Sequence, residues 1–419
     1  MSGGLLRLVW RNLWRNPRRT MIAMTAIGLG YAMLLFVACL MAGLRQQMIE
    51  SGTGLLLSEI EVHAPDYYPD RPLQRTLGGR DGTDVDALVA AITADPRVQA
   101  ASPRVYGGGL VSATHQSAGV QILGVVPDVE QTITVLQTRM VKGSYLTGGM
   151  PKGVVMGDKL ATMIGVEVGS EIVLLTPAAD GSTGNDLYTV AGTFHTGLDA
   201  MDRTLVVMPL ASLQELLRLP PGRIHEIGIK LHDIDEASAT VVAFEVQLSE
   251  TFPVRVRPWQ ELAPELADYV QFNHRVTFIL FFIFFLSAAM GIVSTLLMAI
   301  IERTRELGLL MSLGMRPGQV VGLIVAESAC LAAVSLVLGG ALGAPLLWYL
   351  QVHGLNLGGE GDDSVSLGGI VVGPLWYGRP DWAAYTQAAV GLAVTALASA
   401  LFPALRAARF RPAEALRKV

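Results

Sequence analysis

Four long runs of apolar residues divide the chain, and each is long enough to cross a lipid bilayer as a helix. They cover residues 21–44, 277–301, 318–350 and 382–405. The second run has no charged side chain over 25 residues, about 38 Å of helix at 1.5 Å per residue, which exceeds a hydrocarbon core of about 30 Å. The pattern predicts an α-helical membrane protein with four transmembrane helices.

Residues 45–275, between the first two runs, have a mixed pattern that indicates a large α+β extracytoplasmic domain. Two stretches repeat apolar residues with a helical period, Thr83 to Pro96 and Leu210 to Leu219. Short apolar or alternating runs bounded by Gly and Pro predict strands, at residues 170–177, 187–197 and 204–210.

Two further features of this insertion concern its shape. Residues Pro177 to Asp186, between two predicted strands, are expected to form a projecting hairpin tip. A helical pattern starts at Trp259 and runs into the second span. If it stays helical past Pro264, the domain stands on a rigid stalk.

Composition agrees with a membrane protein, since 51% of the residues are hydrophobic and 16% are charged. A net charge of −5 argues against a nucleic-acid partner. Cys39 and Cys330 lie in apolar runs, so no disulfide framework or Cys-based metal site is expected.

The positions of the basic residues predict the orientation of the spans. Arginines and one lysine gather before the first span, between the second and third, and after the fourth, at Arg7, Arg11, Arg15, Arg18, Arg19, Arg303, Arg305, Arg316, Arg406, Arg409, Arg411, Arg417 and Lys418. By the positive-inside rule these three regions, and therefore both termini and the tail at 406–419, are cytoplasmic. The acidic loop at 351–381 is then extracytoplasmic.

Residues 1–20 predict a cytoplasmic amphipathic helix at the membrane surface. Apolar residues lie on one helical face and Arg7, Arg11 and Arg15 lie on the other. An ordinary positively charged flank is the alternative. A cleaved signal peptide is disfavoured because the apolar run that follows is too long.

The segment 302–317, on the short connection between the second and third spans, predicts a separate helix. Leu307, Leu310 and Met311 share one face, with Leu309 and Leu313 beside them. Gly314 is placed to end the helix in a left-handed cap, and a new helix should open at Pro317. The apolar face would be buried in a folded cytoplasmic groove, whereas a solvated loop or a helix on the lipid surface remains an alternative.

Three segments resemble the FtsX-like ABC permeases of the MacB type. They are "ERTRELGLLMSLGMRPGQ" before the third span, "FPALRAARFRPAEALR" at the C-terminal end and "VWRNLWRNPRRT" at the N-terminal end. Met311 stands where that family commonly has a basic residue. The resemblance implies a coupling helix for an ATPase, made of Glu302, Arg303, Thr304, Arg305, Glu306, Leu307, Gly308, Leu309, Leu310, Met311, Leu313 and Gly314.

The insertion is similar to the extracytoplasmic domains of the LolC/LolE lipoprotein-releasing permeases. The matching positions are Gly157, Leu160, Ala161, Gly169, Phe194, Gly197 and Asp202. In LolC the hairpin at this position carries a hook for a periplasmic lipoprotein carrier. Here the hairpin is short and lacks that pattern, which argues against carrier docking.

These resemblances imply the permease subunit of a mechanotransmitting ABC transporter in the bacterial inner membrane, acting on lipoproteins or lipidic cargo. The implied partners are an ABC ATPase subunit that binds ATP and Mg, a second or homologous permease, membrane lipid, and a periplasmic carrier or adaptor. The motif G-x-x-x-x-G-K-(S/T) is absent from the sequence, so the ATPase is expected to be another polypeptide. Efflux of peptides or amphipathic drugs as in MacB, and signalling to a cell-wall hydrolase as in FtsX, are the alternatives. A receptor without an ATPase would leave the coupling segment without a role.

Other polar and small residues have ordinary interpretations beside functional ones. Glu327 lies within the third span and could carry protons or substrate, but a structural role is favoured. Gly339 and Gly343 suit close helix packing at a dimer interface. His225, Glu226, His232 and Asp233 lack metalloprotease spacing and are interpreted as strand residues, so neither an active site nor a metal site is predicted.

Overall fold

The computed structural model describes residues 11, 14–15, 17–55, 57–78, 82–113, 116–249, 251–356, 365–367, 370–372 and 375–409. Most of the expected amphipathic helix at 1–20, and the tail beyond residue 409, lie outside the described residues. The chain divides into two compact units. We call them the helical unit (1–46, 270–359 and 374–419) and the sheet-rich unit (47–269 and 360–373).

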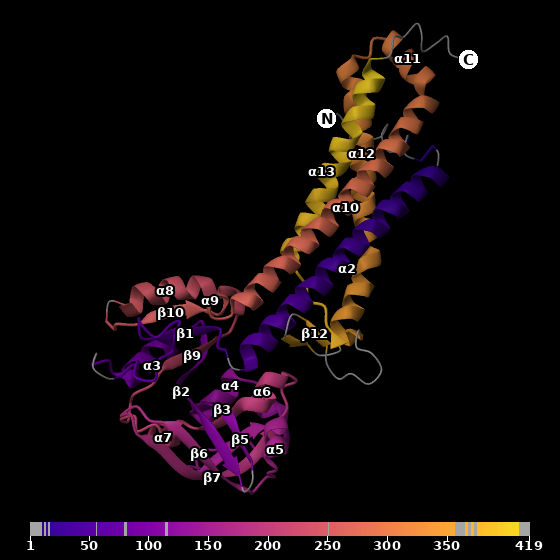
Figure 1. Cartoon of the computed structure of the whole chain (residues 1–419). Helices are drawn as coiled ribbons and strands as arrows, with labels where there is room; N and C mark the ends of the chain where they lie inside the picture. The colour runs from indigo at the N-terminus through magenta and orange to yellow at the C-terminus, as the bar shows by residue number, and fades with distance from the viewer. Residues whose placement is uncertain are drawn as a thin grey trace. The chain divides into compact units, whose positions relative to one another are not determined.

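The described residues contain four helices long and apolar enough to cross a membrane, which confirms the expected number of spans. They are α2 (Pro17–Leu55), α10 (Pro264–Glu302), α12 (Pro317–His353) and α13 (Trp382–Ala408). A fifth, short helix, α11 (Thr304–Ser312), lies between α10 and α12 (Figure 1). α2, α10 and α12 each extend beyond the apolar run that predicted them.

Small residues set the packing of α2 against α12. A Cβ atom on Gly339 would lie 2.4 Å from the carbonyl oxygen of Gly28, so only glycine permits this approach of the two backbones. Four residues on, a Cβ on Gly343 would be in ordinary contact with Ala32 and Leu35. The expectation that Gly339 and Gly343 face a second subunit is therefore wrong, because this pair is used inside the chain.

Two apolar clusters fill the interior of the helical unit. One joins Tyr31, Leu35 and Cys39 of α2 to Phe281, Leu350, Tyr385 and Leu392 of the other spans. The other gathers Ile292, Ile300, Val320 and Ile324 around a row of alanines of α13, Ala396, Ala400, Ala404 and Ala407. Ser328 also donates a hydrogen bond to the carbonyl oxygen of Ala396, at 3.0 Å. Large apolar side chains on the outside of α10, such as Phe278, Phe282 and Met290, remain exposed, as lipid contact requires.

Four short strands lie between α12 and α13 in the chain, two in the helical unit and two in residues 360–373 of the sheet-rich unit. β11 (Leu355–Asn356) pairs with β14 (Leu375–Trp376). The peptide N–H of Gly378 donates to Leu350 and that of Arg379 donates to Cys39, so this loop is tied to α12 and α2. β12 (Val365–Leu367) and β13 (Ile370–Val372) form a separate hairpin.

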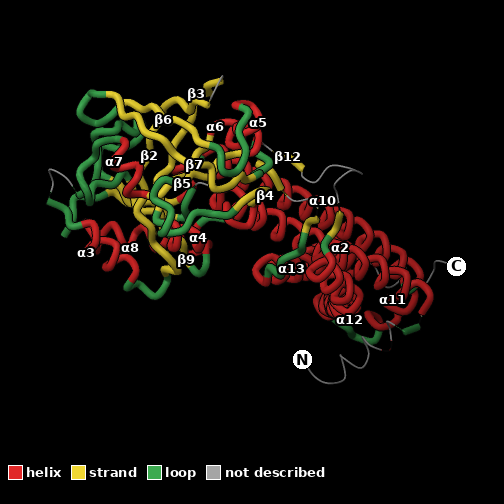
Figure 2. Tube along the Cα trace, turned by 90° about the horizontal axis from the view of Figure 1, so that it is seen from below, coloured by secondary structure: helices red, strands yellow, loops and turns green. Residues whose placement is uncertain are grey.

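The sheet-rich unit is built on a ten-stranded sheet, shown in yellow in Figure 2. Its strands are β1 (Ile60–His63), β2 (Val98–Ala113), β3 (Gln116–Val125), β4 (Met140–Gly143), β5 (Gly153–Gly157), β6 (Glu171–Pro177), β7 (Thr183–Phe194), β8 (Leu205–Pro209), β9 (Glu226–Leu231) and β10 (Arg255–Pro258). Its helices are α3 (Val85–Thr93), α4 (Pro127–Ile133), α5 (Asp158–Ile164), α6 (Asp199–Thr204), α7 (Leu210–Leu216), α8 (Ala237–Ser249) and α9 (Trp259–Leu262), with 3-10 turns at Leu136–Arg139 and Ile234–Glu236.

The long strand β2 joins two halves of this sheet. Its first half, up to Arg104, pairs with β9, which continues to β1 and β10. Its second half, from Val105, pairs with β3, and its end also pairs with β6. Through β3, β8, β5, β7 and β6 the pairing returns to β2, so this half closes on itself and leaves few free strand edges. The α+β fold class expected for the insertion is confirmed.

The helical pattern that starts at Trp259 is interrupted at Ala263 and is continuous from Pro264 into the second span. α9 ends at Leu262, and Ala263 has φ −128° and ψ 73°, outside the helical region. A residue before proline is disfavoured in a helix, and proline fits the first position of the next one. The uninterrupted helix α10 therefore starts at Pro264.

The hairpin tip is also shorter than expected. β6 runs to Pro177 and β7 starts at Thr183, and these two residues are paired across the ladder. Asp186, expected in the loop, lies within β7 opposite Leu174. The N–H of Ala179 donates to Leu217 after α7, so the short turn rests on the domain.

The contact between α2 and α12 predicts a large effect of one glycine and a small effect of its neighbour. Gly339→Val should destabilise the folded chain by about 1–3 kcal/mol, because the added carbons overlap the backbone of α2. Gly340→Val is the matched control, since a Cβ there meets nothing within 4 Å. Thermal unfolding of both variants in lipid nanodiscs measures the difference, and equal stabilities would contradict the assigned packing.

Candidate functional site

The short helix α11 is separated from both neighbouring spans by its local sequence. Arg303, with φ −103° and ψ 10°, interrupts the helix between α10 and α11. Gly314, at φ 99°, ends α11, with the N–H of Gly314 donating to Met311 and that of Met315 donating to Leu310. This is the two-bond Schellman cap, confirming the expected left-handed stop. Arg316 is extended and Pro317 opens α12.

α11 buries part of its apolar surface against α12 and leaves the rest exposed. Leu307 and Gly308 are buried, and Leu307 belongs to the cluster with Val320 and Ile324 of α12. Leu309, Leu310 and Leu313 are 50%, 39% and 76% exposed. The expectation that the whole apolar face needs an external groove is thus wrong for Leu307, because the ends of the spans bury it.

An ion pair joins the start of α11 to α12. Arg303 Nη1 lies 3.2 Å from Glu327 Oε1, and the two side chains are only 17% and 15% exposed. A carboxylate inside a span is costly unless it is paired, so this contact supports the structural role of Glu327 over a transport role. Neither the pairing nor its importance was expected from the sequence, although a lone acidic residue in a span is a signal to look for a nearby arginine.

A second ion pair reaches α11 from the N-terminal segment. Arg15 and Glu306 form a two-point contact, with Arg15 Nη1 2.7 Å from Glu306 Oε2. The hydrogen bonds from Arg15 hold the pKa of Glu306 below its ordinary value. The pair is therefore ionised at neutral pH, but it is about half exposed and contributes little stability.

Two of the exposed leucines line a hollow with charged walls. A cavity of about 550 Å³ is bordered by Leu309 and Leu310, and its charged lining residues are Arg11, Arg15, Arg303, Arg305, Glu306 and Glu327. Because the arginines outnumber the glutamates, the hollow suits a partner surface with an apolar projection and acidic edges. All twelve expected coupling residues, Glu302 to Met311 with Leu313 and Gly314, lie on α11 or at its two ends.

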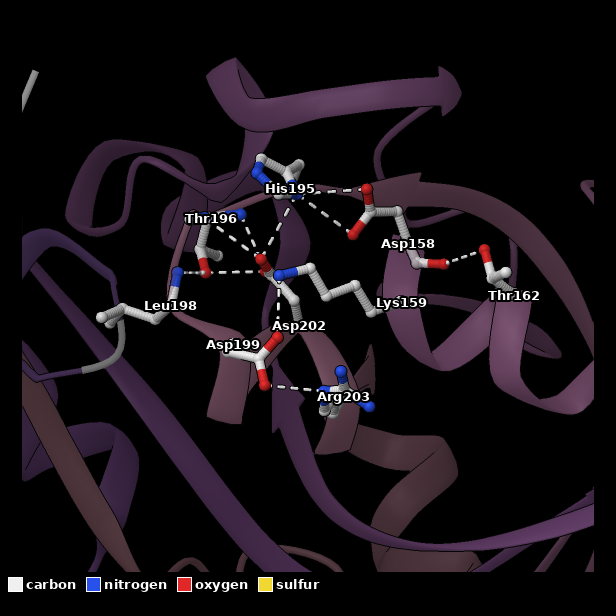
Figure 3. A network of polar contacts seen from close by, with 10 residues as sticks. Asp158, Lys159, Thr162, His195, Thr196, Leu198, Asp199, Asp202 and Arg203 are labelled. Atoms are coloured by element: carbon white, nitrogen blue, oxygen red, sulfur yellow. Dashed lines mark hydrogen bonds and ion pairs between the residues drawn. The ribbon is translucent and has the colours of Figure 1, made fainter. Parts of the chain in front are cut away.

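The sheet-rich unit has a polar cluster that sequence reasoning did not find, shown in Figure 3. His195 Nδ1 lies 3.1 Å from Asp158 and 3.3 Å from Asp202. The carboxylate of buried Asp202 accepts hydrogen bonds from the N–H groups of Thr196 and Gly197 and from the hydroxyl of Thr196. Asp202 therefore fixes the turn after β7.

The family-like positions of this unit have structural roles. A Cβ on Gly157 would lie 2.2 Å from the carbonyl oxygen of Asp202, and Gly169 and Gly197 have φ of 90° and 86°. Leu160, Ala161 and Phe194 are buried. The shared pattern is therefore explained by the packing of β5, α5 and β7 and by the turns that follow α5 and β7.

Leu307 is buried and Leu309 is exposed, so the same substitution should have a large effect on stability at Leu307 and a small one at Leu309. Leu307→Ala should cost about 2–5 kcal/mol, because it leaves a cavity between α11 and α12. Leu309→Ala should change stability by less than about 0.5 kcal/mol, as at most surface positions. Chemical unfolding of the purified chain in detergent measures both, and a loss of stability at Leu309 equal to that at Leu307 would refute the placement of α11.

Comparison with known proteins agrees with this architecture. Residues 278–412 match the family described as FtsX-like permease C-terminal, and residues 20–246, more than half of the chain, match the MacB-like periplasmic core domain.

Among relatives, the lipoprotein-releasing system transmembrane protein LolC of Xylella fastidiosa (strain Temecula1) is 26% identical, and the match covers 95% of this chain and 93% of that protein. The macrolide export ATP-binding/permease protein MacB 1/2 of Paracoccus denitrificans is 23% identical over 99% of this chain and 58% of its own length. The crystal structure of the periplasmic region of MacB from Actinobacillus actinomycetemcomitans aligns with 53% of this chain and 98% of its own, at 11% identity and a TM-score of 0.36. The chain has four long apolar helices with a short helix between the second and third, and both family models match it in order, so it belongs to the FtsX-like, MacB-type permeases of ABC transporters.

Proposed function

We propose that the chain is the permease subunit of a mechanotransmitting ABC transporter of the bacterial inner membrane, and that it moves lipoproteins or other lipidic cargo. Its ATPase is a separate subunit that binds ATP and Mg, and two permeases assemble with two ATPases. Both termini and α11 face the cytoplasm. The observation that carries this proposal is the exposed row of Leu309, Leu310 and Leu313 on a helix fixed to the spans.

The geometry of α11 suits transmission of force. Leu307 and the Arg303–Glu327 pair attach α11 to α12, so a push on the exposed leucines reaches the spans without being absorbed by a loose loop. α10 continues from that end as one helix of 39 residues to Pro264. Closure of the ATPase would therefore displace α10 and α12 together.

The choice of lipidic cargo rests on relatives. LolC and LolE proteins, named as lipoprotein-releasing, match this chain at 23–26% identity, and the LolC proteins of Xylella match almost its full length. An export role like that of the macrolide exporter MacB is the second candidate, supported by the match over 99% of this chain.

Leu310→Arg should uncouple the transporter. A guanidinium in place of an interface leucine should weaken ATPase binding by at least about tenfold, or ~1.4 kcal/mol, and reduce cargo-stimulated ATP hydrolysis to the basal rate. Gly308→Trp should do the same by displacing α11, since Gly308 is buried. The measurement is ATP hydrolysis by the chain co-reconstituted with its ABC ATPase in nanodiscs.

Leu187→Arg, at an exposed leucine of β7, is the matched control and should keep wild-type coupling. Wild-type coupling in Leu310→Arg would overturn the proposed interface. To test the cargo, the same nanodiscs are loaded with a lipid-labelled lipoprotein or with an amphipathic drug. ATP-dependent loss of the drug alone would favour export over lipoprotein release.

A further inference from the structure

A group of ionisable side chains is completely enclosed in the sheet-rich unit. Arg104, Glu61, Glu130 and Glu226 each have 0% of their surface exposed. They come from three neighbouring strands, β1, β9 and β2, and from α4. Buried charges are costly unless each is paired and hydrogen-bonded.

The register of the strands places these groups on one face of the sheet. Glu226 of β9 lies opposite His63 of β1 on one side and opposite Arg104 of β2 on the other. Two residues further on, Gly228 lies opposite Glu61. Side chains at directly opposed positions, and at every second position, share a face.

Gly228 makes room for the guanidinium of Arg104 on that face. A Cβ on Gly228 would lie 3.0 Å from Arg104 Cζ and 3.1 Å from Arg104 Nε, so Arg104 lies across the backbone of β9. From there it forms a two-point contact with Glu130 of α4, at 2.6 Å and 3.3 Å. Both carboxylate oxygens of Glu130 thus accept a hydrogen bond, and Arg104 uses its Nε and Nη2 groups for them.

Glu226 and Glu61 have fewer hydrogen-bond donors than Glu130. Glu226 Oε1 accepts from the hydroxyl of Tyr106 at 2.7 Å and lies 3.7 Å from Arg104. Glu226 Oε2 and both oxygens of Glu61 have no hydrogen-bond donor in the described part of the chain. In the described part of the chain Glu61 forms an ion pair with Arg71 Nη2, at 3.9 Å, and Arg71 is about one-third exposed.

The buried carboxyl groups outnumber the guanidinium groups that lie within 4 Å of them. Within 4 Å, three carboxyl groups, Glu61, Glu130 and Glu226, have two guanidiniums, Arg104 and Arg71. Arg257, opposite Glu61 in the register, pairs with Glu261 instead. If all three carboxyls were ionised, one negative charge would remain uncompensated on side chains that have no exposed surface. Glu61 and Glu226 are neighbours on one face of the sheet, two positions apart in the register of β1 and β9. A proton on one of the two carboxyls would supply a donor, which an ionised carboxylate lacks.

We propose that Glu61 and Glu226 form a proton-binding site of the sheet-rich unit, in which the folded protein holds one proton that the unfolded chain releases. The proton restores neutrality and supplies the missing donor between the two carboxyls. Burial, and then the charge of Glu226, raise the pKa of Glu61 well above its ordinary value, which agrees with this arrangement. Carboxyl groups that share a site commonly behave in this way.

The site is close in the chain to the ends of α2 and α10 that belong to the sheet-rich unit. β1 follows the end of α2, and its partner β10 leads through α9 to α10. Arg71 and Tyr106, which contact the carboxyl pair, also line a cavity of about 660 Å³ with Leu55 of α2 and Leu266 of α10. Loss of the proton would therefore loosen the strands that follow α2 and precede α10 in the chain.

Other titratable groups surround the pair. They are His63 on β1, Arg104 and Tyr106 on β2, Glu130 on α4, His225 beside β9, Arg257 on β10, and Tyr67, Tyr68 and Arg71 in the segment after β1. Burial lowers the pKa of His63 and of His225, so the histidines reduce stability only on acidification. Burial raises the pKa of Tyr106, so the tyrosines act only at strongly alkaline pH.

The sign of the pH effect follows from linkage. The folded pKa of Glu61 is raised, so its contribution to stability is fully present below the unfolded pKa, about 4.3, and is lost as pH rises to the folded pKa. Within this window the opening equilibrium should increase by up to about tenfold per pH unit, which is the effect of one proton. Glu61→Gln, neutral at every pH, should remove this dependence.

The test is hydrogen–deuterium exchange of the full chain in nanodiscs between pH 5 and 9, followed on peptides of β1 and β9. After correction for intrinsic exchange rates, the ratio of the opening constants of wild type and Glu61→Gln should rise by up to about tenfold per pH unit and then level off. Glu171→Gln, at an exposed position of β6, is the control and should give a constant ratio. A ratio for Glu61→Gln that is constant over the whole range overturns the proposal.

A second measurement on the unaltered protein applies even if Glu61→Gln does not fold. Infrared spectra of wild type with ¹³C-carboxyl-labelled glutamate should show a protonated carboxyl band at pH 7 that disappears with a one-proton titration on raising the pH. The absence of such a band at pH 7 overturns the proposal.

Discussion

The ion pair between Arg303 and Glu327 attaches the junction of α10 and α11 to α12. Arg303 is the residue at which α10 stops and α11 starts, and Glu327 lies inside α12. A carboxylate at this depth needs a partner because lipid offers it none. Once Arg303 is held by Glu327, the direction of α11 is set and Leu307 reaches Val320 and Ile324. The exposed position of Leu309, Leu310 and Leu313 is therefore a consequence of charge pairing inside the unit.

Small residues let the long helices of the same unit pack closely against one another. Gly28 and Gly339 bring α2 and α12 into backbone contact, and the alanines of α13 do the same on another side. Because lipid tails are as apolar as leucine, burying large side chains between spans gains little, whereas close approach gains van der Waals contact. Phenylalanines and methionines of α10 are accordingly left on the outside. A tightly packed bundle of this kind can transmit a displacement of α11.

Much of this architecture could be predicted from the sequence, because its signals are local. The spans, the left-handed stop at Gly314 and the helix start at Pro317 each depend on a few adjacent residues. The break at Ala263 was missed, although the proline that causes it is the next residue. Gly339 was correctly identified as a packing position but assigned to the wrong partner, since a small residue does not specify which helix it meets.

The features that could not be predicted depend on contacts between distant residues. Arg303 and Glu327 are 24 residues apart, and Arg104 and Glu130 are 26 apart. Glu226 was interpreted as an ordinary strand residue because its own strand alternates normally. Its environment is set by Glu61 and Arg104, which only the register of β1, β9 and β2 brings beside it.

Both units of the protein bury carboxylates, but they balance them differently. In the helical unit Glu327 has Arg303, and the pair contains equal numbers of opposite charges. In the sheet-rich unit Arg104 is committed to Glu130, and the room above Gly228 that admits its guanidinium is already filled. The remaining negative charge belongs to Glu61 and Glu226, and the proposed proton neutralises it. The helical unit thus balances its carboxylate with an arginine, whereas the sheet-rich unit uses a proton as well.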